Sequence, residues 1–228
     1  MYARYAIYFC PGDQSPLSRY GRQVLGRNAQ KTERKPGSSS GFSDSSRWEE
    51  LTRKPAHYGF HATLKAPFEI AATKQPEALE QACRDLASEH SAIPLTGLAP
   101  RLLNGFAALT LEADPLLLQE LARCCVEKLE LWRAPLSQYD IDRRRNSNLS
   151  ARQLQQLTQF GYPYIFDDFK FHMTLSSQLT DQDQDYVNWL STQYKQLVLS
   201  DPVLDRIALF AQSTRDSPFF RINEFCFA

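Results

Sequence analysis

Apolar residues recur along this chain with two different periods. In some stretches they occupy every second position, which is typical of strands with one buried face, and in others every third or fourth, which is typical of amphipathic helices. The first pattern predicts strands over residues 2–10, 59–68, 93–103, 106–112, 169–177, 203–212 and 219–227. The second predicts helices over residues 17–25, 76–89, 114–131, 150–160 and 180–197.

Turn and cap residues mark several of these boundaries. Asn104-Gly105 stands between two predicted strands, and this pair favours a tight hairpin turn. Ser150 is a good N-cap for the helix that follows it, and Gly161 is expected to end that helix. Strand pairs interleaved with helices recur in both halves of the chain. This order predicts an α+β fold with two similar antiparallel sheets, not a doubly wound parallel fold.

One long segment fits neither pattern. Residues 27–46 are polar, rich in Ser and Lys, and contain Pro36-Gly37-Ser38-Ser39-Ser40-Gly41. Such a composition buries little apolar surface and predicts a flexible loop. Two interpretations stay open for it, because long loops are commonly either disordered or functional. It is a disordered connection, or it is a lid over a nearby site.

The composition narrows the class of protein. The 228 residues are 43% hydrophobic and 23% charged, which is ordinary for a globular enzyme, and the formal net charge is zero. Proteins that bind long nucleic acid usually carry a basic excess, so any phosphate handled here is expected to be small. The first ten residues are too short an apolar stretch for a signal peptide, and no apolar run is long enough to span a bilayer. The 5 scattered cysteines are typical of reduced thiols, and we expect the cytoplasm.

A five-residue motif occurs twice, about half the chain apart. Phe60-His61-Ala62-Thr63-Leu64 is repeated as Phe171-His172-Met173-Thr174-Leu175, and these two segments hold 2 of the 4 histidines. A lone histidine on a strand is most often structural, but two in matched frames favour a function. The repeat therefore predicts a duplicated lobe with a shared cleft, to which each half contributes one imidazole and one hydroxyl.

Strand geometry gives each motif a polar face. Side chains alternate along a strand, so His61 and Thr63 point the same way, as do His172 and Thr174. The same alternation places Lys65 beside His61 and predicts that Lys65 binds substrate. Two imidazoles suit phosphodiester chemistry, because one can accept a proton while the other donates one near neutral pH. The two threonine hydroxyls would donate hydrogen bonds to the phosphate oxygens.

Other chemistries are compatible with parts of the motif. Asp167 and Asp168 lie close to His172 in sequence, and carboxylates with histidine can hold a divalent ion. The first motif has no adjacent acid, however, and no H-E-x-x-H or Cys/His cluster is present. We therefore expect neither a metal nor a cofactor. There is no G-x-S-x-G elbow for a nucleophilic serine and no glycine-rich phosphate loop of a kinase.

The paired motifs resemble those of the two-histidine (2H) phosphoesterase superfamily, the LigT-like proteins, which include RNA 2′,3′-cyclic phosphodiesterases. The resemblance implies a bilobal fold in which two pseudo-symmetric antiparallel sheets, with helices on the outside, enclose a central cleft. It also implies catalysis without a metal. Carried over to this chain, it makes His61 and His172 the acid–base pair and Thr63 and Thr174 the phosphate-binding hydroxyls.

A more specific resemblance covers most of the chain outside the Ser-rich segment. Residues 4–9, 58–68 and 161–164 are similar to a bacterial branch of this superfamily. The branch is named for phosphonate metabolism because its genes occur beside carbon–phosphorus lyase genes. That resemblance implies a phosphorylated sugar as substrate, such as a ribosyl cyclic phosphate. The whole chain, residues 1–228, is then expected to be a single two-lobed 2H phosphoesterase domain.

Three further residues are candidates for substrate binding. Tyr58 and Tyr164 could stack on a sugar or base, or pack at the edges of the lobes. Arg143 could bind phosphate, or lie in a solvated turn with its arginine neighbours. The sequence thus favours a monomeric cyclic phosphodiesterase that acts on a small sugar or nucleotide phosphate and does not bind membranes. The alternative is a non-catalytic binder of phosphorylated ligands or RNA ends.

Overall fold

Seven strands of the computed structural model form one antiparallel sheet, in the order β4-β5-β6-β2-β1-β8-β9. The structure describes residues 2–35, 40–138, 140–141 and 149–228. A separate two-stranded sheet pairs β3 with β7. The strands are β1 (Arg4–Phe9), β2 (Ala62–Phe68), β3 (Ile93–Pro94), β4 (Ala99–Leu103), β5 (Phe106–Thr110), β6 (His172–Gln178), β7 (Val203–Leu204), β8 (Arg206–Gln212) and β9 (Phe220–Cys226).

The large sheet consists of two halves that meet at one residue pair. Strands β2, β1, β8 and β9 form one half-sheet, and strands β4, β5 and β6 form the other. They join where Ala62 of β2 pairs with Met173 of β6, inside the two repeated motifs. The predicted α+β class and its antiparallel sheets are confirmed. The two halves, expected as two sheets, are continuous at this junction because the motif strands pair with each other.

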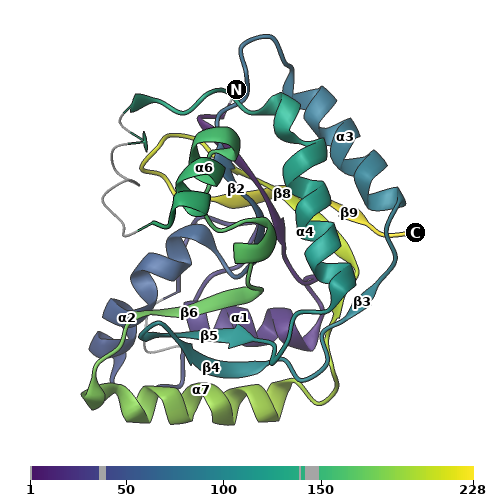
Figure 1. Ribbon diagram of the computed structural model, residues 1–228. Coiled ribbons are helices and arrows are strands. Elements are labelled where there is room, and N and C mark those ends of the chain that lie inside the picture. Colours follow the sequence, from purple (N-terminus) through teal and green to yellow (C-terminus); the bar gives the residue numbers. More distant parts are fainter. Residues whose placement is uncertain (1, 36–39, 139, 142–148) are drawn as a thin grey trace.

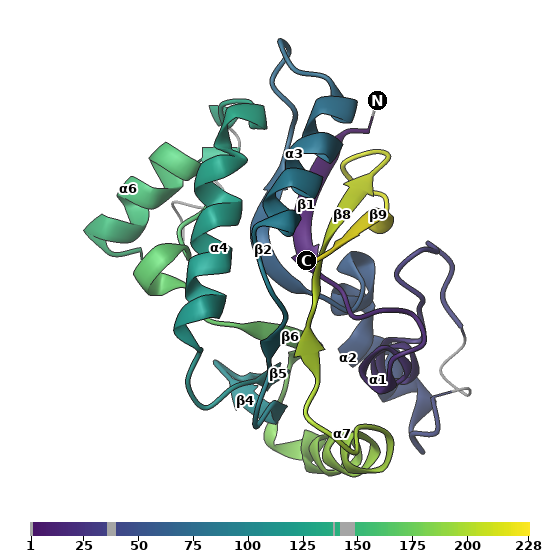
Figure 2. The same cartoon turned by 90° about the vertical axis from the view of Figure 1, so that its right-hand side faces the viewer.

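Helices pack on each half-sheet (Figures 1 and 2). Helices α3 and α4 contact the β2-β1-β8-β9 half, while α1, α2 and α7 contact the β4-β5-β6 half. The described residues also form the short 3-10 turns η2 (Glu130–Trp132), η3 (Phe166–Asp168) and η4 (Asp181–Asp183). The helices are α1 (Pro16–Leu25), α2 (Ser45–Tyr58), α3 (Pro76–Ser88), α4 (Leu116–Lys128), α6 (Ala151–Phe160) and α7 (Gln184–Leu197).

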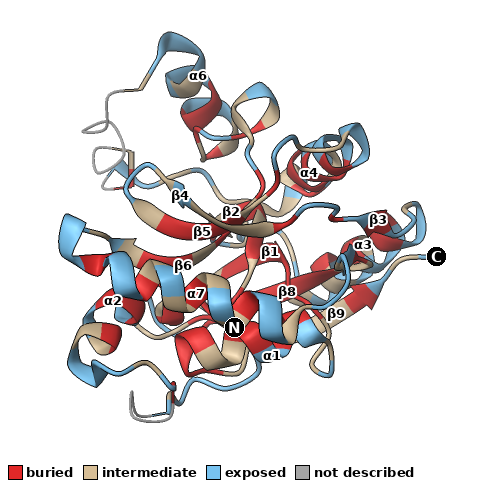
Figure 3. Cartoon of the chain, turned by 90° about the horizontal axis from the view of Figure 1, so that it is seen from below, coloured by how far each residue is buried: buried red, intermediate tan, exposed pale blue. Residues whose placement is uncertain are grey.

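Two buried clusters lie on opposite faces of the sheet. The larger cluster fills the space between the sheet and the helices, and it includes Ala62, Leu64, Met173 and Leu175 from the motif strands. Burial is accordingly concentrated on the strands and on the helix faces turned towards them (Figure 3). The smaller cluster lies on the other face of β1 and β8 and consists of Ala6, Tyr8, Cys10, Ala208, Phe210 and Phe219.

Most of the predicted turns and caps are present. Asn104 and Gly105 have φ values of 49° and 83°, the left-handed pair that a tight hairpin between β4 and β5 requires. Ser150 and Gln153 form a capping box at the start of α6, and Gly161 ends that helix with φ 77°. The strand predicted over 93–103 is wrong as a single element. Gly97, at φ 73°, turns the chain between β3 and β4, which belong to different sheets.

The sequence did not predict α2, which leads directly into the first motif. Asp44 caps this helix by accepting a hydrogen bond from the Arg47 amide. Trp48, Leu51 and Ala56 bury one face of it in the larger cluster. The helical period was hard to recognise because the buried positions are separated by a dense run of charged residues. Pro55 in the last turn also disfavours a helix in sequence-based prediction.

The polar segment 27–46 is more tightly packed than its composition predicted. Arg27 is only 4% exposed, and its guanidinium donates hydrogen bonds to the carbonyls of Ala56, His57 and Phe219. Arg34 stacks on Trp48 at 4.4 Å. The expectation of little burial is therefore wrong for these two arginines. Residues 36–39 of this segment lie outside the described residues.

Candidate active site

The two H-x-T motifs face each other across the junction of the half-sheets. Ala62 pairs with Met173, and the strands are antiparallel. Continuing that register by one residue in each direction places His61 opposite Thr174 and Thr63 opposite His172. The histidine of each motif therefore neighbours the threonine of the other. All four side chains lie on the face opposite the larger cluster, because Ala62 and Met173 point into that cluster.

His61 is held by a backbone carbonyl and an aromatic ring. Its Nδ1 donates to the Gly59 carbonyl at 2.8 Å, which leaves Nε2 as the acceptor. The Thr63 hydroxyl lies 3.3 Å from that Nε2. The imidazole stacks on Tyr8, with ring centroids 3.8 Å apart and planes inclined by 24°. Gly59 has φ 82°, a conformation that a residue with a side chain rarely adopts.

Burial sets the protonation state of His61. The pKa of His61 is lowered to about 4, chiefly by the loss of solvent around the ring and to a smaller extent by the charges of His172 and Arg27. The hydrogen bond to Gly59 acts in the opposite direction but is the smaller effect. Because that pKa is well below neutral pH, His61 is uncharged at pH 7 and can accept a proton at Nε2.

His172 repeats this arrangement on the second motif strand. Its Nδ1 donates to the Lys170 carbonyl at 2.8 Å, so the same tautomer leaves its Nε2 free. The ring is half-buried, and the edge of Phe106 lies against it with centroids 6.2 Å apart. Both imidazoles are thus fixed through Nδ1 by the carbonyl two residues earlier in the chain.

A cavity of about 290 Å³ opens between α2 and the second half-sheet. Its lining includes His61 and Thr174, one from each motif, and the predicted binding residue Tyr58. The Tyr58 ring stacks on Phe219 at 5.6 Å, with an interplanar angle of 18°. The other lining residues are Lys54, Pro55, Gly59, Phe106, Ser176, Ser177 and Gln178.

Lys65 does not lie beside His61, and the prediction that placed it there is wrong. The pairing of β1 with β2 shifts between Tyr8–Thr63 and Ile7–Lys65, so β2 has one extra residue at this point. Such a β-bulge reverses the alternation of side chains beyond it. Lys65 consequently points towards α4, where Nζ donates to the Val126 carbonyl at 3.0 Å and pairs with Glu130 at 2.7 Å.

The remaining predicted residues are more distant from the cavity. Tyr164 is 45% exposed and packs edge-on against Tyr162 at 5.6 Å, and it is not among the cavity-lining residues. Arg143 lies outside the described residues.

Asp168, considered above as a possible metal ligand, accepts hydrogen bonds from Arg152 at 2.8 Å and Gln153 at 3.1 Å. No group of three His, Cys, Asp or Glu side chains within the described ranges could hold a metal ion.

Tyr8 is a site residue that the sequence analysis missed. It lies on the face of β1 that belongs to the smaller buried cluster, and it forms the stacking surface for His61. The signal was present in the alternation Arg4-Tyr5-Ala6-Ile7-Tyr8-Phe9. This alternation was not informative alone. Both faces of the strand are buried, so the sequence did not show which face lies on the same side of the sheet as the two motifs.

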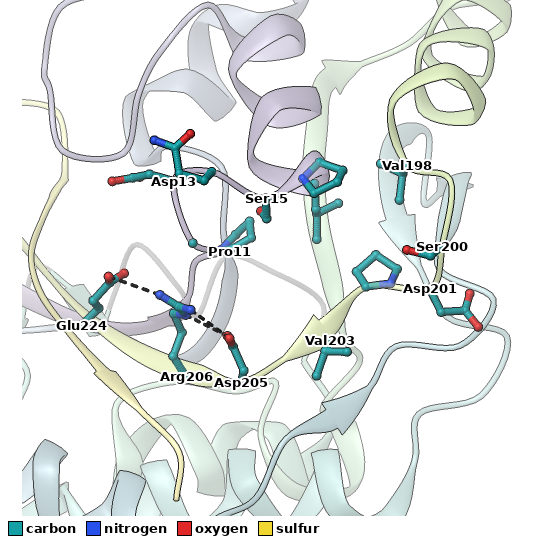
Figure 4. A pocket seen from close by; sticks show the side chains of 15 residues that line it. Pro11, Asp13, Ser15, Val198, Ser200, Asp201, Val203, Asp205, Arg206 and Glu224 are labelled. Carbon is teal, nitrogen blue, oxygen red and sulfur yellow. Dashed lines mark hydrogen bonds and ion pairs between the residues drawn. The ribbon is translucent and has the colours of Figure 1, made fainter.

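A second hollow, of about 660 Å³, lies at the start of α1 (Figure 4). Its charged groups pair mostly with each other: Arg206 bonds Asp205 at 2.7 Å and lies 3.2 Å from Glu224. Neither motif contributes a residue to its lining.

In the described part of the chain, no helix has both the length and the apolar character to cross a bilayer.

Comparison with known protein families identifies the family of this chain. A family model described as "Protein of unknown function (DUF1045)" matches residues 63–220, more than half of the chain. The chain belongs to this family. The matched part of this DUF1045 member contains the second motif completely and begins at Thr63 in the first.

Two curated relatives of this DUF1045 member share a name. A "Ribose 1,5-bisphosphate phosphokinase PhnN" from Janthinobacterium sp. (strain Marseille) is 37% identical over 186 residues, which cover 81% of this chain and 41% of that protein. Another of the same name, from Laribacter hongkongensis (strain HLHK9), is 34% identical over 218 residues, which cover 95% of this chain and 50% of that protein. The chain thus spans half or less of the length of these relatives.

Solved structures of phosphoesterases are similar to this DUF1045 member along its length. A crystal structure of E. coli LigT complexed with 3′-AMP aligns over 100% of this chain and 99% of its own, with 12% identity and a TM-score of 0.42. A crystal structure described as a phosphoesterase aligns over 99% of both chains, with 14% identity and a TM-score of 0.40.

Proposed function

We propose that this chain is a metal-independent phosphodiesterase that hydrolyses a small cyclic phosphate by His/His acid–base catalysis. The observation that carries the proposal is the antiparallel pairing of Ala62 with Met173. Continued by one residue on each side, this register brings each imidazole next to the other motif's hydroxyl. Four groups that can bind and protonate a phosphodiester thus come from both halves of the chain to one junction. The cavity beside them suits a sugar or nucleotide rather than a long polymer.

The two histidines take different roles in this mechanism. His61 is neutral at pH 7 because its pKa is lowered to about 4, so its Nε2 accepts a proton from the attacking water. The water oxygen forms a bond to phosphorus as the bond to the leaving oxygen breaks. His172, as the imidazolium, donates its Nε2 proton to that leaving oxygen. Its Nδ1 hydrogen bond to Lys170 is compatible with both protonation states.

The threonines stabilise the phosphoryl group. Thr63 and Thr174 flank the junction on the same face as the imidazoles, so their hydroxyls can donate to the two non-bridging oxygens. Fixed donors that are in place before the reaction require little reorganisation as charge develops. The reaction thus converts a cyclic diester and one water into a phosphate monoester that carries the freed hydroxyl.

The relatives support a ribosyl substrate. The name of both relatives contains ribose 1,5-bisphosphate. Hydrolysis of a 5-phosphorylated ribose 1,2-cyclic phosphate at the bond to O2 leaves a phosphate on C1, which yields that bisphosphate. The chain itself contains no glycine-rich phosphate loop, so we assign it the hydrolysis and not the phosphorylation.

The test is a panel of sugar and nucleotide cyclic phosphates incubated with the purified chain and EDTA. Release of a monoester in the presence of the chelator supports the proposal. Activity that EDTA abolishes and a divalent ion restores would indicate a metal hydrolase. Binding of cyclic phosphates without any turnover would instead indicate a non-catalytic binder of phosphorylated ligands.

A further inference from the structure

A single peptide group links Asp114 to the imidazole of His172. The N–H of the peptide between Lys170 and Phe171 donates to Oδ2 of Asp114 at 2.8 Å. The carbonyl of the same peptide accepts the hydrogen bond from Nδ1 of His172, also at 2.8 Å. The N–H and the C=O of a trans peptide point in opposite directions. The carboxylate, the peptide and the imidazole therefore form one chain of hydrogen bonds.

Asp114 approaches this peptide from the connection between β5 and α4. Thr110, the last residue of β5, pairs with His172, and the chain then leaves the sheet. The Asp114 side chain is half-buried and lines a hollow of about 350 Å³ together with Lys170 and Phe171. A carboxylate that accepts from a backbone N–H makes a charge-assisted bond, which is stronger than a bond between neutral groups. The bond therefore fixes the backbone immediately before the imidazole.

The charge of Asp114 also acts on His172. Burial raises the pKa of the Asp114 carboxyl, whereas the bond from the Phe171 amide and the positive charges of His172 and Lys170 lower it. An interaction between two charges is mutual, so the carboxylate stabilises the imidazolium as much as the imidazolium stabilises the carboxylate. A charge at one end of a hydrogen-bonded chain also polarises the groups along it. The Lys170 carbonyl thereby becomes a stronger acceptor for the imidazolium.

Charged groups on the neighbouring elements differ from Asp114 in sign or are already paired. Lys170 is a cation, as is Lys54 of α2, a helix that packs on β6. His61 is uncharged at pH 7. The nearby carboxylates have arginine partners: Glu112 lies 3.4 Å from Arg101, while Asp167 and Asp168 pair with Arg152. Asp114 is thus the carboxylate in position to act on the second motif histidine.

We propose that Asp114 is a positioning residue for the general acid: it orients His172 through the peptide between Lys170 and Phe171, and its negative charge favours the imidazolium. This inference rests on the proposed function, in which His172 protonates the leaving oxygen. It gives a reason why two matched motifs take different roles. His61 is buried and the positive charges near it oppose its protonation, whereas His172 has a carboxylate at the end of its hydrogen-bonded chain.

The charge is tested with Asp114→Asn, which keeps an oxygen acceptor for the Phe171 amide. Activity is lost at high pH when His172 gives up its proton, so removing the charge should move this alkaline limb of the kcat/KM profile to lower pH. We expect a shift of about 0.5–1 pH unit, the size for two unit charges several ångströms apart near a surface. About 1 M NaCl should reduce the shift by screening the charges.

The matched control is Glu112→Gln. It removes one negative charge from the same connection between β5 and α4, and the Glu112 side chain is 87% exposed. The charge of an exposed carboxylate is largely screened by solvent, so the alkaline limb should stay in place in this variant.

The hydrogen bond is tested with Asp114→Ala, which removes the acceptor as well as the charge. On the acid side of the limb, we expect kcat to be on the order of tenfold lower in Asp114→Ala than in Asp114→Asn, because the imidazole loses its fixed orientation. Hydrogen exchange of the Phe171 amide should also be faster in Asp114→Ala than in Asp114→Asn.

An NMR titration of the His172 Cε1 proton measures the effect of the charge without any substrate. Its midpoint should move to lower pH in Asp114→Asn by the same amount as the alkaline limb. An unmoved midpoint, an equal shift in Glu112→Gln, or equal kcat in the asparagine and alanine variants would each overturn the inference. Absence of turnover on every cyclic phosphate, with the midpoint shifted as expected, would contradict the proposed function alone.

Discussion

The imidazole of His61 lies against the phenol ring of Tyr8, with centroids 3.8 Å apart. Tyr8 belongs to β1, and His61 directly precedes the adjacent strand β2, 53 positions later in the chain. Tyr8 removes solvent from one side of the ring, and burial is the largest cause of the lowered pKa of His61. The stacking contact thus couples the packing of the sheet to the protonation state of the candidate base.

Replacing Tyr8 should change that protonation state. In Tyr8→Leu the stacking surface is smaller and water gains access to the imidazole, so we expect the pKa of His61 to rise from about 4 towards its ordinary value. Tyr8→Phe keeps the ring and should leave the pKa unchanged. The measurement is an NMR titration of the histidine Cε1 protons. An unaltered titration in Tyr8→Leu would show that another group sets the pKa.

Replacing either motif histidine should remove most of the activity. His61→Ala and His172→Ala each delete one proton-transfer group, whose contribution is typically about 10²- to 10⁴-fold in rate. Thr63→Val and Thr174→Val should lower kcat by about 10²-fold each, because each removes one donor to the phosphoryl oxygens. The control for loss of an imidazole is His90→Gln, because the His90 ring packs against Phe227, away from the motifs. A loss below tenfold in both alanine variants would refute the assignment.

The stability of the fold should decrease in mild acid through His61. Its pKa is about 4 in the folded chain, below the value of about 6.5 expected when unfolded. Between these values the unfolded chain binds a proton that the folded chain does not, so the free energy of unfolding falls as the pH is lowered from 6.5 to 4. Urea titrations at pH 7 and pH 5 should show a smaller decrease for His61→Gln than for the wild type. Equal decreases would mean that other groups are responsible.

Lys65 should matter for stability and not for substrate binding. It is 3% exposed and pairs with Glu130, which also bonds Arg133. Lys65→Met leaves the Val126 carbonyl and one carboxylate oxygen without their donor, so we expect a loss of about 1–3 kcal/mol in the free energy of unfolding. KM should stay within about twofold of the wild type at a temperature where the variant is folded. A raised KM with unchanged stability would restore Lys65 to the substrate site.

Much of the architecture follows from local sequence. The spacing of apolar residues predicts nearly every strand and five of the helices, because side-chain period is a property of the element itself. Asn104-Gly105 predicts the β4–β5 hairpin, since few other pairs adopt two left-handed conformations in succession. The repeated motif identifies both candidate histidines, as no local structural demand explains two F-H-x-T-L segments.

The tertiary structure alone decides what surrounds those histidines. The bulge after Thr63 turns Lys65 towards α4, and this shift depends on how β2 pairs with β1 rather than on the residues of β2. The same holds for Tyr8, whose strand is buried on both faces. Alternation along one strand fixes which residues share a face, but only pairing with its neighbours fixes which face meets the candidate active site.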